Sequence, residues 1–305
     1  MNKISVVILN WNGVDDTIAC LKSIQELSLK DYKLSVIVVD NKSSDDSLKR
    51  LREIKLKNAG YELLTNNANY GFAKGNNIGI ANAIDGGAEY ILVLNNDTEV
   101  DSQTLQRMVG FMNNNPQFGA ISPKIYFAKG YEFHKKRYRE SDLGKVIWYA
   151  GGDIDWANVY GANHGVDEVD QGQFEEVRET DFSTGACSLL RVETLKKVGL
   201  YEEKYFMYLE DVDLSVRIKK SGWKIGYCDG AHIWHKVAQS SSVGSDLNDY
   251  FITRNRMFFG FRYASVRAKV ALIKESFRLL LAGRKWQRVG VKDFYLGKLG
   301  KGSWR

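Results

Sequence analysis

The sequence predicts an α/β fold: a doubly wound, mostly parallel sheet with a C-terminal helical extension. Short aliphatic runs without polar alternation are typical of strands buried on both faces of a parallel sheet. Amphipathic helical patterns lie between these runs, and this alternation of strand and helix is the pattern of a doubly wound sheet. After residue 249 the pattern changes to aromatic residues interleaved with cations, which indicates the extension.

The composition is that of a folded globular protein. The chain has 305 residues, of which 44% are hydrophobic, so it can bury a substantial core. The first strand-like run begins at Ile4, which leaves no room for a signal peptide, and no uncharged apolar stretch reaches the length of a membrane span. The protein is therefore expected in the cytoplasm. The three cysteines lack CxxC spacing and are expected to be buried thiols rather than disulfides or zinc ligands.

Each predicted element rests on its own periodicity. The expected strands cover residues 4–9, 34–39, 62–65, 90–94 and 224–228. A helix at 17–27 has its apolar residues on one face, a second helix follows the N-cap signal between Ser43 and Asp46, and a third covers 73–84. The segment 126–173 has no clear periodicity and is predicted to form loops.

Polar residues follow the first two predicted strands, where a doubly wound sheet binds its ligands. Asn10 and Asn12 come after the first strand, and Asp40 and Asn41 end the second. A carboxylate at the position of Asp40 can accept hydrogen bonds from a ribose or a base. The alternative is that Asp40 and Asn41 start a turn and cap the next helix.

Two further segments carry candidate ligand-binding groups. Residues 69–79 contain glycines at every fourth position, which allow the backbone to approach either a nucleotide or a neighbouring element closely. The triplet Asn95, Asn96 and Asp97 follows a strand and presents one carboxylate, which suits a divalent ion that holds a diphosphate. A turn residue is the alternative for Asp97.

An aromatic run delivers Glu210, Asp211 and Asp213 to the start of a helix. Acids at this position are stabilised by the helix dipole without any further function. Three carboxylates within four positions repel one another, however, which favours a functional role for this cluster. His235 is a further candidate, because a metal site with only one carboxylate needs other ligands, although a single histidine is commonly a satisfied polar residue.

Taken in order, these segments resemble the family-2 inverting glycosyltransferases with the Rossmann-like GT-A fold, especially the rhamnosyltransferase-like members. The resemblance runs from Ile4 to about Arg262, and its landmarks are residues 38–45, 69–77, 94–97 and 199–214. It implies a nucleotide-diphosphate sugar as donor, with rhamnose or another hexose as the sugar. It also implies a saccharide hydroxyl as acceptor, on a surface glycan or a lipid-linked saccharide. The aperiodic segment 126–173 is expected to form loops around that acceptor.

The resemblance implies a role for each site residue. Asp97 corresponds to the metal-binding aspartate of the family's DxD motif and His235 to a histidine that completes the metal site in some members, so Mg²⁺ or Mn²⁺ is the expected cofactor. Asn95 replaces the first acid of that motif, which weakens the expectation of strict metal dependence. Asp211 corresponds to the catalytic base that deprotonates the acceptor, with Glu210 as the alternative. The residues implied to bind the donor nucleotide are Leu9, Asn10, Asn12, Asp40, Asn41, Asn69, Gly71, Asn76 and Asn96.

The predicted domains are a catalytic domain at 1–249, with a nucleotide-binding half at about 1–100 and an acceptor-side half at about 101–249, and a basic helical region at 250–305. Roughly 14 lysines and arginines face two acids between residue 254 and the C-terminus. Three interpretations of this region stay open: helices packed on the catalytic domain, an amphipathic surface resting on anionic lipid at the inner face of the membrane, or a homodimer interface. Nucleic acid is not expected as a partner, because no recognised binding motif accompanies the charge.

Two rival functions are compatible with parts of the pattern. A sugar nucleotidyltransferase shares the sheet architecture but is expected to carry a glycine-rich phosphate loop with a basic residue directly after the first strand, and residues 10–13 do not resemble one. A non-catalytic nucleotide- or glycan-binding protein is the other rival, motivated by the missing first acid at Asn95.

Overall fold

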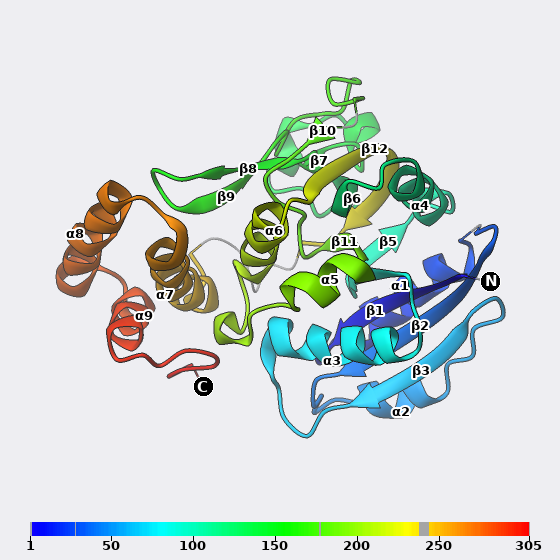
Figure 1. Ribbon diagram of the computed structural model, residues 1–305, viewed down its shortest axis with the longest axis horizontal. Coiled ribbons are helices and arrows are strands. Elements are labelled where there is room, and N and C mark those ends of the chain that lie inside the picture. Colours follow the sequence, from blue (N-terminus) through cyan, green and yellow to red (C-terminus); the bar gives the residue numbers. More distant parts are fainter. Residues whose placement is uncertain (1, 28, 177, 238–243, 305) are drawn as a thin grey trace.

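The computed structural model describes residues 2–27, 29–176, 178–237 and 244–304. Within these residues, a ten-stranded sheet carries helices on both faces, and a two-stranded sheet lies beside it. The C-terminal helices lie on the side of the molecule remote from β1, β2 and β3 (Figure 1). The predicted α/β class and the helical C-terminal extension are both confirmed.

The large sheet is mixed, with its parallel part where the sequence predicted it. Its strand order is β10, β12, β6, β11, β4, β1, β2 and β3, with β5 paired to β12 and β7 to β6. Strands β3, β2, β1 and β4 are parallel, whereas β11 is antiparallel to both of its neighbours. The strands are β1 (Asn2–Asn10), β2 (Tyr32–Asp40), β3 (Gly60–Thr65), β4 (Tyr90–Asn95), β5 (Thr98–Val100), β6 (Phe118–Phe127), β7 (Ile147–Tyr149), β8 (Gly152–Asp155), β9 (Tyr160–Asn163), β10 (Arg178–Glu179), β11 (Cys187–Arg191) and β12 (Lys224–His235).

Two hydrophobic cores lie on opposite faces of this sheet. Alternate residues of β1 point to opposite sides, so Val6 packs with α1, α2 and α4, while Val7 packs with α3, α5 and α6. Both faces of the parallel strands are thereby covered, which explains their unbroken aliphatic sequence. The helices are α1 (Val14–Gln25), α2 (Ser47–Arg52), α3 (Gly71–Asp85), α4 (Thr104–Asn114), α5 (Val192–Val198), α6 (Glu210–Lys220), α7 (Asp246–Tyr263), α8 (Val266–Ala282) and α9 (Lys285–Tyr295), with short 3₁₀ turns at Lys135–Arg137, Glu140–Asp142 and Glu203–Tyr205.

Two sequence predictions need correction. The segment 126–173, predicted as loops, contains β7, β8 and β9, which are too short to produce a periodic pattern. The strand predicted at 224–228 continues to His235 after a register shift between Cys228 and His232, so His235 ends a strand rather than following one. Helices α1 and α2 are also displaced or shortened relative to the predicted boundaries, whereas β3 and α3 lie where they were expected.

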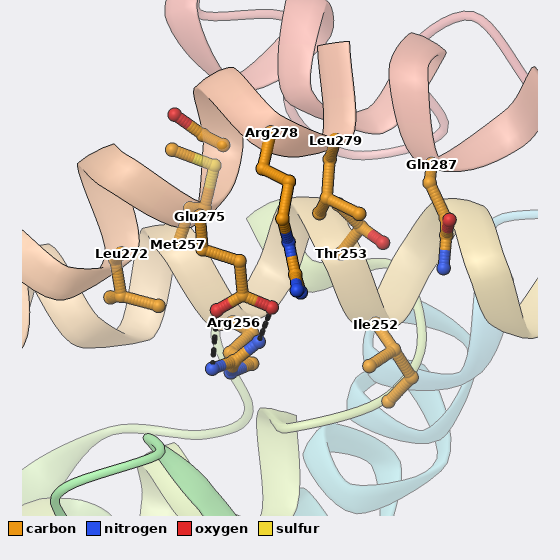
Figure 2. A pocket seen from close by; sticks show the side chains of 10 residues that line it. Ile252, Thr253, Arg256, Met257, Leu272, Glu275, Arg278, Leu279 and Gln287 are labelled. Atoms are coloured by element: carbon orange, nitrogen blue, oxygen red, sulfur yellow. Dashed lines mark hydrogen bonds and ion pairs between the residues drawn. The ribbon is translucent and has the colours of Figure 1, made fainter. Parts of the chain in front are cut away.

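The C-terminal helices pack against one another and against the loop that precedes α6. A recess between α7 and α8 is lined by the ion pair of Arg256 with Glu275, whose atoms lie 2.9 Å apart, and by Thr253 and Arg278 (Figure 2). No residue of the predicted site lines this recess. Among the described residues, no helix combines the length and the apolar content that a membrane crossing requires. The three cysteines are buried and free, as predicted.

Candidate active site

The carboxyl ends of the parallel strands meet at one edge of the sheet. The register sets Asn10 opposite Asp40 and Leu9 opposite Asn95, and Asp40 in turn lies opposite Thr65 of β3. The predicted site residues after β1, β2 and β4 are therefore neighbours, although they lie far apart in the sequence. This edge is where a doubly wound sheet binds its ligand.

The turns after β1 and β2 are joined by hydrogen bonds. Asn10, which is fully buried, donates from Nδ2 to Ser43 Oγ over 3.1 Å, and Asn12 Oδ1 accepts from Ser44 N over 2.7 Å. The carboxylate of Asp40 accepts a 3.0 Å hydrogen bond from Ser43 N, and only 1% of Asp40 is exposed. Asp40 thus makes the turn contact that the sequence left open as an alternative, while its contact with a nucleotide stays a prediction.

Asn41 fixes the loop that leads into α3. Its Nδ2 lies 3.0 Å from Asn69 Oδ1 and 3.1 Å from the carbonyl oxygen of Gly71, and its Oδ1 accepts from Tyr70 N over 3.1 Å. Asn41 is 1% exposed, so its amide serves contacts inside the protein. These bonds hold Asn69 and Gly71 beside the carboxyl end of β2.

The glycines of α3 allow this helix to lie directly on β1. A Cβ added at Gly75 would lie 2.5 Å from Leu9 Cδ1, and a Cβ added at Gly79 would lie 2.5 Å from Val7 Cγ1. Close packing, which the sequence left open as an alternative, thus accounts for both residues. Gly71 has a φ of +75°, and a Cβ there would lie 2.5 Å from the Phe206 ring, so it requires glycine on two grounds.

Residues after β4 connect this edge to the segment before β11. Asn96 Nδ2 lies 3.2 Å from the carbonyl oxygen of Gly13, which ties it to the turn after β1. Asn95 N donates to the carbonyl oxygen of Ala186 over 2.9 Å, so the residues before β11 lie opposite the turn at 95–97.

Asn76, on the first turns of α3, is 1% exposed and has a buried Oδ1 without a hydrogen bond.

Asp97 and His235 lie in contact at the same edge. Nε2 of His235 is 3.1 Å from Oδ1 of Asp97, and their side chains are 7% and 18% exposed respectively. Oδ1 of Asp97 and Nδ1 of His235 are nevertheless buried without a hydrogen-bond partner, so the contact has the distance but not the angle of a hydrogen bond. A buried carboxylate oxygen without a hydrogen bond and an imidazole in contact with it are groups that a divalent cation accepts as ligands, although Asn95 Nδ2 also lies 3.5 Å from His235 Nε2. Among the described residues, no group of three or more His, Cys, Asp or Glu side chains is arranged to hold a metal.

Asp211, at the first turn of α6, is held beside the turn at 95–97. Its Oδ2 accepts a 2.8 Å hydrogen bond from Gly185 N, and Gly185 precedes the residue that bonds to Asn95. Burial raises the pKa of the Asp211 carboxyl above its ordinary value, although the N–H groups of Gly185 and Val212 act in the opposite direction. Its side chain stays partly exposed. The structure therefore brings Asp40, Asp97 and Asp211 to one edge of the sheet.

The three acids at the start of α6 have different environments. Glu210 is 5% exposed and its Oε2 has no hydrogen-bond partner, and burial together with the neighbouring Asp211 raises its pKa well above the ordinary value. Asp213 is fully buried and accepts from Arg217 Nε over 2.8 Å, while Arg262 Nη1 lies 3.1 Å away on its other side. Of the three, Asp211 alone combines partial exposure with a fixed carboxylate.

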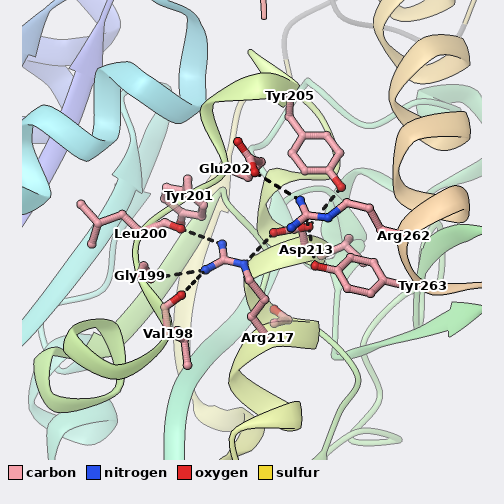
Figure 3. Close-up of polar contacts among 12 residues, drawn as sticks. Val198, Gly199, Leu200, Tyr201, Glu202, Tyr205, Asp213, Arg217, Arg262 and Tyr263 are labelled. Atoms are coloured by element: carbon pink, nitrogen blue, oxygen red, sulfur yellow. Dashed lines mark hydrogen bonds and ion pairs between the residues drawn. The ribbon is translucent and has the colours of Figure 1, made fainter. Parts of the chain in front are cut away.

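Asp213 belongs to a polar cluster that holds the segment before α6. The hydroxyl groups of Tyr205 and Tyr263 both donate to it, over 3.1 and 2.8 Å (Figure 3). Arg217, which donates to Asp213, also donates to the carbonyl oxygens of Val198 and Leu200 over 2.7 and 2.6 Å. Asp213 therefore has a structural role. The prediction that all three acids of this cluster are functional is wrong for this residue.

Two residues of α7 that the sequence did not single out hold the loop at 204–209, which we call the base loop. Arg254 is fully buried and donates to the carbonyl oxygen of Tyr205 over 2.9 Å. Asn255 Nδ2 lies 2.7 Å from the carbonyl oxygen of Met207 and 3.0 Å from that of Tyr208. Arg254 also donates to Asn255 Oδ1, which orients the amide. The sequence signal that could have indicated these two residues is the pattern of aromatic residues and cations after residue 249. The same pattern is equally typical of an exposed basic surface, so it did not predict their contacts.

The base loop requires such support because its backbone is strained. Phe206, Tyr208 and Leu209 have φ values of 67°, 68° and 70°. Bulky side chains at positive φ cost about 1–2 kcal/mol each and persist only where surrounding contacts impose them. Arg254 and Asn255 supply those contacts directly before Glu210 and Asp211.

Comparison with known proteins identifies the class to which this fold and site belong. Residues 5–199 match the family described as Glycosyl transferase family 2, and the chain belongs to this family. It is a glycosyltransferase that transfers a sugar from a nucleotide sugar, so the resemblance drawn from the sequence is confirmed.

Two curated relatives carry related activities. The chain is 22% identical to the low-salt glycan biosynthesis hexosyltransferase Agl10 of Haloferax volcanii. The 266 aligned residues cover 85% of this chain and 77% of the relative. It is 26% identical over 218 residues to the N-acetylglucosaminyl-diphospho-decaprenol L-rhamnosyltransferase of Mycobacterium tuberculosis, with 68% of each chain covered.

A solved structure with the same fold is that of GalNAc-T7 with UDP, GalNAc and Mn²⁺. The two structures superpose with a TM-score of 0.63 at 16% sequence identity, over 97% of this chain and 57% of the other. The chain thus spans little more than half of that protein. The superposition confirms the predicted GT-A fold.

Proposed function

We propose that this glycosyltransferase inverts the anomeric centre of its donor sugar and transfers a hexose or deoxyhexose, such as rhamnose, to the hydroxyl of a surface-glycan or lipid-linked saccharide. The observation that carries the proposal is the fixed carboxylate of Asp211 opposite the turn at 95–97. In a single displacement, a base on the acceptor side removes the hydroxyl proton while the diphosphate leaves from the opposite face of the sugar. The two relatives, a hexosyltransferase of glycan biosynthesis and an N-acetylglucosaminyl-diphospho-decaprenol rhamnosyltransferase, support a saccharide acceptor.

The strand ends on the β1 and β2 side are proposed to bind the donor nucleotide. The carboxylate of Asp40 and the exposed side chain of Asn12 are proposed to contact the ribose or base, although Oδ1 of Asn12 also accepts from Ser44 N and the Asp40 carboxylate from Ser43 N. The side-chain amides of Asn10, Asn41 and Asn69 form hydrogen bonds within the protein. We therefore propose that these three residues hold the shape of the pocket. Leu9, Gly71, Asn76 and Asn96 are proposed to line the same edge, supported by the contacts of Leu9, Gly71 and Asn96.

Asp97 and His235 are the residues proposed to hold a divalent cation, Mg²⁺ or Mn²⁺. The contact of His235 Nε2 with Asp97 Oδ1 and the lack of a hydrogen bond to that buried oxygen support this assignment, and so does the Mn²⁺ of the GalNAc-T7 structure. When bound, the cation would neutralise the negative charge of the departing diphosphate.

Asp211 is proposed as the general base in preference to Glu210. A base must reach the proton that it removes, and Asp211 is partly exposed, whereas Glu210 is 5% exposed. The raised pKa of Asp211 also makes its carboxylate a stronger base than an ordinary aspartate. We propose that residues from about 1 to 100 bind the donor and that residues from about 101 to 249 bind the acceptor. The region 250–305 is proposed to support the base loop.

The test is release of nucleoside diphosphate from a panel of nucleotide sugars in the presence of saccharide acceptors. The wild type is expected to release diphosphate, and Asp211→Asn to lose about 100-fold or more of the rate. Asp85→Asn, at the exposed end of α3, is the matched control and should retain full activity. Equal rates for wild type and Asp211→Asn would exclude this base, and binding without release would favour the non-catalytic alternative. Formation of pyrophosphate from a sugar phosphate would favour the nucleotidyltransferase.

A further inference from the structure

Helix α8 presents an apolar face to solvent on the outside of the molecule. It packs against α7 and α9 through Ala268, Leu272 and Ser276, and Figure 1 shows it at the end of the molecule remote from β1 to β3. The exposed apolar residues on its other side are Val266 (76% exposed), Val270 (44%), Phe277 (59%) and Leu281 (86%). At about 100° per residue, these four fall within about 60° of one another around the helix axis.

The fold leaves most of this face in water. The helix already buries a separate face against α7, and the cost of leaving Phe277 and Leu281 in water is offset by no contact within the described part of the chain. Contiguous exposed apolar residues of this kind mark a surface that another phase or partner covers.

Cations border the apolar face, and among the described residues no ion pair joins Arg267 or Lys274 to a carboxylate. Arg267 and Lys274 are exposed and lie about 70° and about 50° from its centre on the helical wheel. Beyond residue 263 the sequence contains two acids, Glu275 and Asp293, and both are engaged inside the protein. Glu275 pairs with Arg256 over 2.9 Å, and Asp293 is 2% exposed and accepts from Ser303.

We propose that α8 docks in the interfacial region of a bilayer that contains anionic lipid. Its apolar side chains enter the boundary between headgroups and acyl chains, and Arg267 and Lys274 contact the anionic headgroups. A second copy of the chain is a poorer occupant, because a two-fold interface through this face would bring the same cations of both copies together. The proposal goes beyond the transfer reaction, since it concerns where the enzyme meets its surroundings.

Sedimentation of the full chain with lipid vesicles tests the proposal. Vesicles of phosphatidylcholine mixed with phosphatidylglycerol are expected to bind the wild type, with affinity that falls as salt is raised, and vesicles of phosphatidylcholine alone to bind it much less. The double variant Phe277→Ser with Leu281→Ser should lose roughly tenfold or more of the binding. The matched control Val166→Ser, an exposed apolar residue between β9 and β10, should bind as the wild type does.

A second pair of variants tests the charge. Arg267→Glu with Lys274→Glu should abolish the preference for anionic vesicles, whereas Lys55→Glu with Lys57→Glu, the same change of net charge at exposed positions before β3, should preserve it. Thermal melting confirms that each variant is folded. Absence of binding to anionic vesicles overturns the proposal, as does equal binding by the Phe277 and Leu281 variant. A dimer in sedimentation velocity that this same variant abolishes would assign the face to a second copy. Vesicle binding requires no turnover, so this proposal and the proposed reaction can fail separately.

Discussion

The backbone N–H of Gly185 donates a 2.8 Å hydrogen bond to the carboxylate of Asp211. This contact joins the first turn of α6 to the residues before β11, which are paired in turn with the end of β4. It thereby fixes the distance between the proposed base and the proposed metal ligand Asp97 through the backbone of the sheet. The carboxylates of Asp211 and Asp97 are thus connected mainly through backbone, with few rotatable side-chain bonds between them. This rigidity favours precise positioning of the acceptor hydroxyl.

The pH dependence of turnover should report the Asp211 carboxyl. A base acts in its ionised form, and burial raises the pKa of this group, so kcat should fall as the pH is lowered through a value above the ordinary aspartate pKa of about 3.9. Steady-state rates between neutral and acid pH measure this limb. It should be absent from the residual activity of Asp211→Asn, and a wild-type limb at or below the ordinary value would contradict the assignment.

Glu210→Gln should stabilise the protein at neutral pH. The pKa of Glu210 is raised in the folded state, so the folded protein binds this proton more tightly than the unfolded chain, and wild-type stability falls as pH rises from about 4.3 towards the raised value. Gln resembles the protonated form and avoids that loss. We expect a rise in Tm of about 2 °C or more at neutral pH and no difference below about pH 4.

The control for this experiment is Glu203→Gln, an exposed acid seven positions earlier in the sequence, which should leave Tm nearly unchanged. A lower Tm for Glu210→Gln at neutral pH would show instead that the ionised carboxylate is stabilised by a contact in the folded protein.

Asp97→Asn should weaken binding of a divalent cation in the presence of a nucleoside diphosphate. The substitution removes the negative charge of the carboxylate, and with Asn95 already in place of an acid the triplet would contain none. The thermal stabilisation by Mn²⁺ with UDP, GDP or dTDP should require about tenfold or more Mn²⁺ than in the wild type. Asp101→Asn, just beyond β5, is the control. Equal Mn²⁺ dependence in Asp97→Asn and wild type would remove Asp97 from the proposed metal site.

Asn255→Ala should lower kcat while leaving KM for the donor unchanged. Its amide bonds hold the carbonyl groups of the base loop, whereas the proposed nucleotide side consists of residues of the first hundred. We expect a loss of about tenfold in kcat, because a base displaced from its productive geometry costs rate rather than donor affinity. Asn255 is thus a positioning residue.

The neighbouring Arg256 provides the matched control. Arg256→Lys breaks a two-point ion pair with Glu275 of α8 and leaves the base loop untouched, so it should reduce Tm without changing kcat. If Asn255→Ala lowered only the Tm as well, the base loop would not depend on α7 for its catalytic geometry.

The periodic pattern of the chain was sufficient to predict a doubly wound, mostly parallel sheet and the positions of its parallel strands, whereas their order in the sheet became known only from the structure. Buried aliphatic runs are dictated by local sequence, and parallel pairing aligns their carboxyl ends, so Asn10, Asp40 and Asn95 could be predicted to meet. Short strands such as β7 and β9 escaped prediction, because a strand of three or four residues has no measurable period.

The division of labour within the acid cluster depends on partners from distant segments. Asp213 pairs with Arg262 and accepts a hydrogen bond from Tyr263, both of α7. Glu210 is buried, and Asp211 accepts from Gly185 N. Sequence spacing treats the three carboxylates alike, since their separation along the chain says nothing about which neighbours will surround them. The same holds for Arg254, whose role is visible only when the base loop lies against it.

By itself, the sequence determined the class of fold, the family and the edge of the sheet at which chemistry is expected, because these follow from periodicity and from short motifs whose residues are close together in the chain. Tertiary structure alone decided which acid is partly exposed, which one is paired, and how the C-terminal helices support the base loop while leaving one face of α8 in solvent. The physical reason is that burial and electrostatic environment are properties of the surroundings of a side chain, and those surroundings are assembled from residues remote in sequence.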